Sequence, residues 1–178
     1  VNDKGLGELA DALRKLEYEK FEIKLLLIGE IDGEDDALTK DKLNYLMQSK
    51  NVKYIGVQSD IRPYLMASDV LVFPSYREGF PNVPLEAGAL GLPAIVTNIN
   101  GSNEIIQDGV NGKIIQAPLD NKGVRVNDIT IELYTMMKWF YYHPEEVKRM
   151  GENARPIICE RYEQQNVWNA LLKFYIDL

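Results

Sequence analysis

Five short runs of aliphatic residues constrain the fold of this chain more than any other feature. They lie at 23–28, 52–57, 70–73, 94–97 and 113–115. Each run is too short for a helix, and none alternates regularly between apolar and polar residues. Continuous apolar runs of this length are typical of strands that are buried on both faces, as in parallel sheets.

Segments with helical periodicity separate these runs. Leucines recur at spacings of three and four residues over 6–16, and apolar residues do so again over 43–47. Asn82 and Pro84 precede a third apolar segment and are residues typical of a helix start. The alternation predicts an α/β class with a doubly wound, Rossmann-like parallel sheet between layers of helices.

The length of 178 residues and the 46% hydrophobic content predict one globular domain over 1–178. Strand and helix alternate over 1–126, whereas 127–178 shows only helical stripes and forms a predicted helical tail. The last stripe contains Val167, Leu171, Phe174, Tyr175 and Leu178. We expect it to pack on its own domain, with docking onto a second domain as the alternative. The chain starts at Val1 without Met, which suggests a start inside a longer protein.

The charge balance excludes several classes of protein. Lys and Arg total 20 against 27 Asp and Glu, so the net charge is −7, and the pI near 4.8 argues against a nucleic-acid partner. No apolar run approaches the roughly 20 residues of a membrane span. The single cysteine, Cys159, cannot form an internal disulfide or a multi-cysteine zinc site. We therefore expect a soluble domain, and a reducing compartment fits.

The turn after the third aliphatic run has the strongest functional pattern, because ligands bind at the carboxyl ends of strands in doubly wound sheets. We expect Gly79 to allow an unusual backbone path and Asn82 to cap the following helix. A helix N-terminus has unpaired N–H groups that suit a phosphate. Pro81 and Pro84 have no N–H, so the available donors are the amides of Gly79, Phe80, Asn82, Val83 and Leu85.

Glu78 and Glu86 flank this turn. Two carboxylates can serve as general acid and base, as in a glycoside hydrolase, or as acceptors for hydroxyl groups. The spacing favours acceptors, because a phosphate between them leaves one carboxylate for each end of a nucleotide-sugar. A plainer interpretation is equally open: Glu86, in the first helical turn, complements the helix dipole and Glu78 is a solvated loop residue.

Other motifs carry less weight. The segment Gly5-Leu6-Gly7-Glu8-Leu9-Ala10 satisfies a dinucleotide fingerprint on paper, but only four residues precede it where a strand is needed. No two Asp residues are spaced by one, so the Asp-x-Asp motif of metal-dependent sugar transferases is absent, and we expect no metal site. His143 has no ligand partners at metal spacing and is expected to be structural. Arg77 could contact phosphates or neutralise Glu78.

The chain resembles the C-terminal donor-binding domain of retaining glycosyltransferases of family 4, the glycosyl transferases group 1, which have the GT-B fold. The two glutamates separated by seven residues, Glu78 and Glu86, match the hallmark of that family. The match covers essentially the whole chain, because Lys4-Gly5 also falls where the family has it. Further matching segments are Phe73-Pro74-Ser75, Gly79-Phe80-Pro81-Asn82, Gly91-Leu92-Pro93, Asn103-Glu104-Ile105-Ile106 and Asn111-Gly112.

The resemblance implies a nucleoside diphosphate sugar as donor, with a UDP-sugar as the first expectation, and neither metal nor cofactor. Glu86 would accept from the ribose hydroxyls and Glu78 from those of the transferred sugar. Lys4 would grip the diphosphate and stabilise the leaving group, together with an Arg whose position falls before Val1. The turn residues Gly79, Phe80, Pro81 and Asn82 would lie along the sugar and phosphates. Backbone groups near Val57, Gln58 and Ile61 would recognise the base.

The resemblance also implies the reaction and the partners. A hexose would pass to an acceptor hydroxyl with retention of configuration. The acceptor, a glycan or lipid-linked glycan, would be bound mainly by an N-terminal domain that this chain lacks. The parent protein would act in polysaccharide biosynthesis in the cytoplasm, with peripheral association at the cytoplasmic face of a membrane left open. The isolated chain would bind UDP weakly and be inactive in transfer. A UDP-sugar epimerase of GT-B architecture and a non-catalytic nucleotide-binding module are the alternatives.

Overall fold

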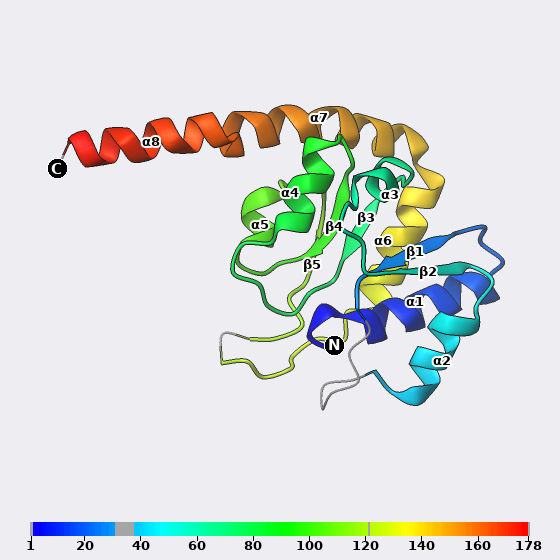
Figure 1. Cartoon of the computed structure of the whole chain (residues 1–178). Helices are drawn as coiled ribbons and strands as arrows, with labels where there is room; N and C mark the ends of the chain where they lie inside the picture. The colour runs from blue at the N-terminus through cyan, green and yellow to red at the C-terminus, as the bar shows by residue number, and fades with distance from the viewer. Residues whose placement is uncertain (1, 31–37, 121, 178) are drawn as a thin grey trace.

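The computed structural model describes residues 2–30, 38–120 and 122–177. Each aliphatic run contains a strand. The strands are β1 (Leu25–Ile28), β2 (Val52–Gly56), β3 (Leu71–Phe73), β4 (Ala94–Thr97) and β5 (Gly112–Ile115). Their pairings are all parallel. The α/β class predicted from the sequence is therefore confirmed (Figure 1).

The described strands form two hydrogen-bonded ladders, in the orders β1-β2 and β3-β4-β5. Both ladders contribute to one hydrophobic core. Leu25 of β1 and Val72 of β3 pack against the same cluster, which contains Leu13 of α1 and Ile95 of β4. Helix α1 (Leu6–Tyr18) thus joins the two ladders through its apolar side chains.

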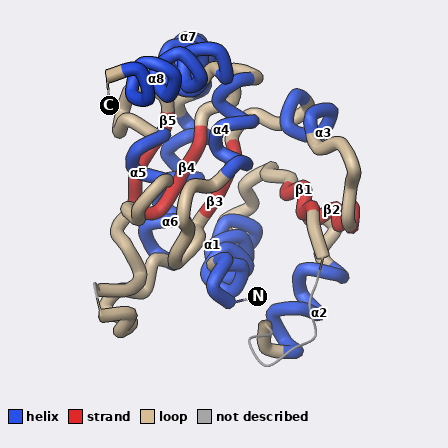
Figure 2. Tube along the Cα trace, turned by 60° about the vertical axis from the view of Figure 1, so that its left-hand side comes forward, coloured by secondary structure: helices blue, strands red, loops and turns tan. Residues whose placement is uncertain are grey.

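Helices lie on both faces of the second ladder (Figure 2). Ile95 points to the cluster of α1 and α6, whereas Val96 packs on the other face with Ile105 and Ile158. The remaining helices are the 3-10 turn η1 (Asn2–Lys4), α2 (Lys40–Gln48), α3 (Arg62–Met66), α4 (Asn82–Ala89), α5 (Ser102–Ile105), α6 (Thr130–Tyr142), α7 (Pro144–Tyr162) and α8 (Gln164–Ile176).

The expectation that the strands are buried on both faces holds for β4 but not for β2. All four residues of β4 are buried, which accounts for its three successive apolar residues before Thr97. In β2 the expectation of burial on both faces is wrong, because Lys53 and Tyr54 are exposed. The physical reason is position: β2 ends its ladder, whereas β4 lies in the middle of the other.

The start of α1 depends on a glycine. Gly5 has a φ of 68°, in the left-handed region, and a Cβ there would lie 2.2 Å from the carbonyl oxygen of Pro74. Only glycine allows this approach without a shift of the backbone. The contact holds the residues before α1, including Lys4, beside the turn that follows β3.

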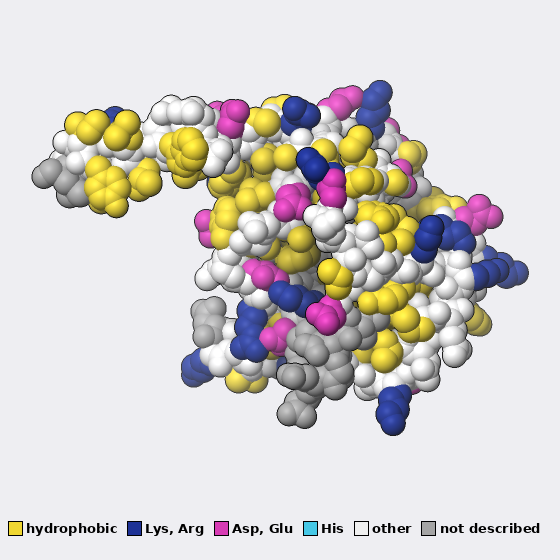
Figure 3. Space-filling view, viewed as in Figure 1, with side chains coloured by type: hydrophobic (Ala, Val, Ile, Leu, Met, Phe, Trp, Pro, Cys, Tyr) yellow, Lys and Arg dark blue, Asp and Glu magenta, His cyan; other side chains and the backbone are white. Residues whose placement is uncertain are grey.

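The helical tail divides into a packed part and a projecting part. Leu133 and Phe140 of α6, and Met150 of α7, belong to the core. Helix α8 has no buried residue, and Trp168 and Tyr175 are 55% and 65% exposed. The expectation that the last stripe packs on its own domain is wrong, because α8 continues away from the body and shows its apolar side chains on the surface (Figure 3). Leu178 lies outside the described residues.

Candidate functional site

The turn that leads from β3 into α4 is fixed to its neighbours by buried polar contacts. The Thr97 hydroxyl, at the end of β4, donates to the carbonyl oxygen of Ser75. The Ser75 hydroxyl in turn donates to Oε1 of Glu78 at 2.7 Å. Both Ser75 and Thr97 are buried. The carboxyl ends of two adjacent strands therefore orient the Glu78 carboxylate.

Lys4 and Glu78 lie together at this edge. Lys4 Nζ is 2.6 Å from Glu78 Oε1. The segment that carries Lys4 is held by a backbone hydrogen bond of 2.7 Å, in which the Tyr76 amide donates to the Asp3 carbonyl. The Lys4 side chain is 49% exposed and that of Glu78 is 16% exposed. The ammonium group therefore remains accessible to an anion, whereas the carboxylate is held in one orientation.

Arg77 pairs with Asp3 and not with its neighbour Glu78. Its guanidinium donates from Nε to Asp3 Oδ2 at 2.7 Å, and it forms an ion pair with the same carboxylate. The contact adds a second tie between the Lys4 segment and the turn. The Arg77 side chain is exposed, so the pair itself contributes little free energy.

The start of α4 differs from the sequence expectation. Pro81 is the N-cap, and Asn82 is the first helical residue, so the prediction that Asn82 caps the helix is wrong. Pro81 fits because it has extended backbone angles, φ −78° and ψ 129°, as a cap residue needs. The cap carbonyl accepts the first intrahelical bond, from the residue four positions on, which is Leu85. The free donors at this helix start are thus the amides of Asn82 and Val83.

Glu86 lies beyond the first turn of α4, because the helix has no acidic residue in that turn. It is exposed, and it lies within electrostatic reach of Arg62 at the start of α3. The pKa of Arg62 is raised above its ordinary value, first by a hydrogen bond and then by the charge of Asp60, with a smaller contribution from Glu86. Glu78 therefore contacts the α1 side of the site, while Glu86 is directed toward α3.

The expectation for Gly79 is also wrong. Its φ is not among the positive values, and a Cβ at this position would meet no atom within 4 Å. The backbone does not require glycine here, and the space beside it is open. A glycine without conformational need is consistent with close approach of a ligand to the backbone.

The other candidates lie in the same turn, after β2 and at the start of α3. Phe80 is 45% exposed and its ring lies 5.5 Å from that of Tyr162. Pro81 is buried. Val57 is exposed after β2, and Ile61 is partly buried as the N-cap of α3.

Sequence reasoning missed a buried charged group next to this site. Glu8 of α1 is buried, and it pairs with Arg125, from the connection between β5 and α6. The two residues are 117 positions apart, so no spacing in the sequence signals the contact. Ser75 was likewise not recognised as the partner that orients Glu78.

Two further observations concern other parts of the molecule. A hollow of about 890 Å³ lies at the amino ends of β1 and β2, where Arg14, Glu17 and Tyr45 are among its lining residues. It shares no residue with the candidate site. His143 Nδ1 lies 2.7 Å from the Trp139 carbonyl oxygen, and the two rings stack. Over the described ranges, no three His, Cys, Asp or Glu side chains gather as a metal site would require.

The fold and the strand-end turn define an α/β domain with a cation, a carboxylate and a helix N-terminus at one edge. A family model described as "Glycosyl transferases group 1" matches residues 1–156. The chain belongs to this family, as its resemblance indicated, and its fold is the Rossmann-like half of the GT-B fold.

Solved structures agree on the fold. The chain is similar over its full length to Anabaena Alr3699/HepE in complex with UDP, with a TM-score of 0.83 and 22% identity, and it covers 46% of that chain. It also resembles TarM, with a TM-score of 0.76 and 20% identity, over 97% of this chain and 32% of that one.

Several sequence relatives are glycosyltransferases by name. The capsular polysaccharide biosynthesis glycosyltransferase CapM of Staphylococcus aureus is 30% identical over 98% of this chain and 43% of its own length. The UDP-Gal:alpha-D-GlcNAc-diphosphoundecaprenol alpha-1,3-galactosyltransferase of Escherichia coli is 39% identical over 83% of this chain and 36% of its own. The chain thus spans about two-fifths of the length of these relatives. Within the described residues, no helix is both long and apolar enough to cross a membrane.

Proposed function

We propose that this chain is the donor-binding domain of a glycosyltransferase and that its donor is a nucleoside diphosphate sugar, specifically a UDP-sugar. The observation that carries this proposal is the contact of 2.6 Å between Lys4 Nζ and Glu78 Oε1 at the carboxyl edge of β3. It brings a cation for a diphosphate and an acceptor for hydroxyls to one point, beside the free amides of Asn82 and Val83.

This arrangement offers a protein group to each part of the proposed UDP-sugar donor. Lys4 and the amides at the start of α4 bind the diphosphate, and Lys4 stabilises the negative charge that develops on it as the sugar leaves. Glu78 accepts hydrogen bonds from the transferred sugar, while Glu86 accepts from the ribose diol. Val57 and Ile61 lie beside the base. The open space at Gly79 admits the sugar and phosphates to the backbone of the turn.

The reaction proposed for the whole protein is transfer of a hexose to an acceptor hydroxyl with retention of configuration, without metal or cofactor. A further domain binds most of the acceptor, a glycan or lipid-linked glycan. Two similar proteins support this assignment. The name of the E. coli relative describes a galactosyltransferase with UDP-Gal and a diphosphoundecaprenol-linked sugar as substrates, and HepE was solved in complex with UDP. We place the protein in the cytoplasm, at the membrane face where such acceptors lie.

Calorimetric titration of the chain with UDP tests the proposal. We expect weak but measurable binding, and Glu86→Ala should reduce the affinity about tenfold or more, because a charged hydrogen-bond acceptor is lost. Glu152→Ala, which removes an exposed glutamate from α7, is the matched control and should leave the affinity unchanged. Absence of heat with the unaltered chain, or equal losses in both variants, would contradict the assignment.

A further inference from the structure

Glu8 is a buried carboxylate on an otherwise apolar helix face. It is 6% exposed and its neighbours Leu9, Ala12 and Leu13 belong to the core. Removing a carboxylate from water costs free energy unless charged or hydrogen-bonding partners compensate. The groups that compensate the Glu8 carboxylate therefore indicate its role in the structure.

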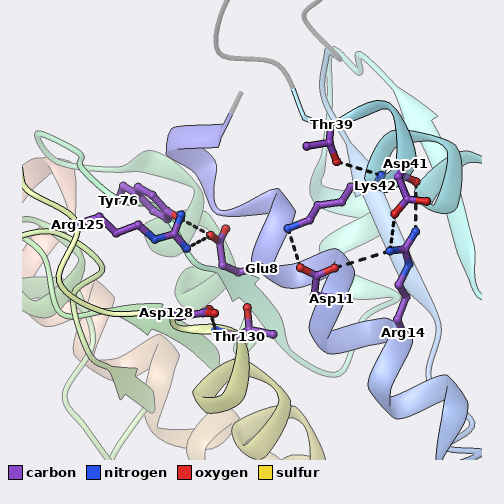
Figure 4. A network of polar contacts seen from close by, with 10 residues as sticks. All are labelled: Glu8, Asp11, Arg14, Thr39, Asp41, Lys42, Tyr76, Arg125, Asp128 and Thr130. Carbon is purple, nitrogen blue, oxygen red and sulfur yellow. Dashed lines mark hydrogen bonds and ion pairs between the residues drawn. The ribbon is translucent and has the colours of Figure 1, made fainter.

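Two side chains converge on Glu8 from different segments (Figure 4). The Tyr76 hydroxyl donates to Glu8 Oε1, and the Arg125 guanidinium donates to the same oxygen. The Arg125 guanidinium carbon also lies 5.6 Å from the centroid of the Tyr76 ring. We call Glu8, Tyr76 and Arg125 the Glu8 triad. It joins α1, the turn after β3 and the connection between β5 and α6.

Tyr76 is the member that touches the candidate donor site. Its backbone amide holds the Asp3 carbonyl, next to Lys4, and its neighbour Ser75 holds the Glu78 carboxylate. Its side chain is anchored at the other end by Glu8. The position of Tyr76 therefore sets how the Lys4 segment lies against the turn that carries Glu78.

Arg125 lies in the connection between β5 and α6, where described residues on either side of it pair with each other. Residues Leu119 and Arg125 form an isolated antiparallel bridge, and the Asn127 side chain donates to the Ala117 carbonyl at 2.7 Å. The charge of Arg125 compensates that of Glu8. Burial lowers the pKa of Arg125, but the hydrogen bond to Glu8 and the electrostatic interactions with Tyr76, Glu8 and Asp128 together raise it above its ordinary value. The connection thus supplies the cation that the buried carboxylate needs.

We propose that the Glu8 triad positions the donor site: Glu8 fixes Tyr76, and Tyr76 fixes the Lys4 segment against the Glu78 turn before any donor binds. The inference rests on the proposed function. Preorganisation of this kind reduces the cost of ordering the site on binding. Glu8, Tyr76 and Arg125 are positioning residues, because they act through Lys4 and Glu78.

The chain contains a matched control at the other end of α1. The Tyr134 hydroxyl donates to Glu19 Oε1 at 2.6 Å, and Lys138 Nζ lies 2.7 Å from Glu19 Oε2. We call Glu19, Tyr134 and Lys138 the Glu19 triad. It also combines a carboxylate, a tyrosine hydroxyl and a cation, with a lysine in place of the arginine, but it shares no residue with the candidate site.

The test compares Tyr76→Phe and Glu8→Gln with Tyr134→Phe and Glu19→Gln. UDP affinity is measured by titration of amide chemical shifts, and hydrogen exchange of the Tyr76 amide is measured without UDP. We expect the first pair to lower the affinity two- to tenfold, about the effect of one hydrogen bond, and to speed exchange of the Tyr76 amide. The second pair should change neither. Arg125→Lys should retain more affinity than Arg125→Ala, which a role in bulk stability alone does not predict.

The outcomes separate this inference from the proposed function. If the unaltered chain binds no UDP, the proposed function fails and the positioning role fails with it. If the unaltered chain binds UDP but the Glu8-triad variants bind equally well, only the positioning role is wrong. Faster exchange at Tyr76 without loss of affinity would also overturn it, because the triad would then hold the backbone without affecting the site.

Discussion

The two triads on α1 use the same chemistry in different surroundings. Each joins a glutamate, Glu8 within α1 or Glu19 at the C-cap of α1, to a tyrosine hydroxyl and a cation from elsewhere in the chain. The Glu8 side chain is 7% exposed, whereas that of Glu19 is 31% exposed. The Glu8 triad lies at the carboxyl edge of the strands and links three segments; the Glu19 triad links α1 only to α6.

Burial decides what each triad contributes. A surface ion pair is worth little, since water solvates both partners when it breaks. A buried carboxylate that loses its partners is left unsatisfied and costs much more. The pKa of Tyr76 is raised first by burial and then by the hydrogen bond to Glu8. The pKa of Glu19 is lowered, first by its hydrogen bonds to Lys138 and Tyr134. We therefore expect the same kind of contact to be structural at one end of α1 and dispensable at the other.

The largest expected effect is on UDP affinity, and it should distinguish Lys4, which precedes α1, from Lys138 of the Glu19 triad at the other end of that helix. Lys4→Ala should reduce UDP affinity about ten- to a hundredfold, because a charged hydrogen bond to the diphosphate is lost. Lys138→Ala, in the Glu19 triad, should leave it unchanged. Isothermal calorimetry measures both. Equal affinities in the two variants would remove Lys4 from the site.

The second effect is on stability. Glu8→Ala should lower the free energy of unfolding by about 1–3 kcal/mol, because Tyr76 loses its partner and Arg125 loses its counter-charge; half of the Arg125 side chain is exposed, which keeps the loss from being larger. Glu19→Ala should have a clearly smaller effect. Urea denaturation of both variants checks this, and the reverse order would contradict the role of burial.

The third effect is on UDP-glucose affinity and concerns the empty space beside Gly79, at the carboxyl edge of the strands. Gly79→Ala should reduce UDP-glucose affinity about three- to tenfold by occupying space beside the turn, as a misplaced methyl group does in a binding site. Thermal stability should hardly change, because the backbone there is unstrained and a Cβ meets nothing within 4 Å. A loss of stability with normal affinity would show that Gly79 has a conformational role instead.

The smallest effect is spectroscopic. Because its pKa is raised, Tyr76 should still be protonated when an ordinary tyrosine, with a pKa of about 10, is half ionised. Its contribution to stability is therefore present below that pH and is lost as the pH rises further. In an alkaline titration followed by tyrosinate absorbance, Tyr76→Phe should remove a late-titrating group. Burial also raises the pKa of Tyr45 and of Tyr162, so a late phase remains in this variant and its amplitude is the readout. An unchanged amplitude would mean that Tyr76 is not one of the shielded tyrosines.

Much of the fold could be predicted from the sequence. The strands were predicted from their short apolar runs, and α1 was predicted from its stripe of leucines. Helices α3 and α5 were missed because they contain only five and four residues, too few to show a period. Helix α8 was predicted to pack on its own domain, but none of its residues is buried. An apolar stripe on a helix indicates a packing face, but it does not identify the element that packs against that face.

The site was predicted only in part. Glu78 and Glu86 were selected from the pattern of the strand-end turn and Lys4 from the family resemblance, and the structure brings Lys4 to Glu78. The glutamates of the turn were visible because they are close in sequence. The Tyr76 and Arg125 contacts to Glu8 join residues 68 and 117 positions apart, and such contacts arise only from tertiary packing.

A crystal structure of the chain with UDP-glucose tests the central claim most directly. The account predicts that the diphosphate lies within hydrogen-bond distance of Lys4 Nζ and of the Asn82 or Val83 amide, with the ribose hydroxyls on Glu86. Binding of the nucleotide in the hollow at the amino ends of β1 and β2, with Lys4 and Glu78 still in contact only with each other, would contradict it.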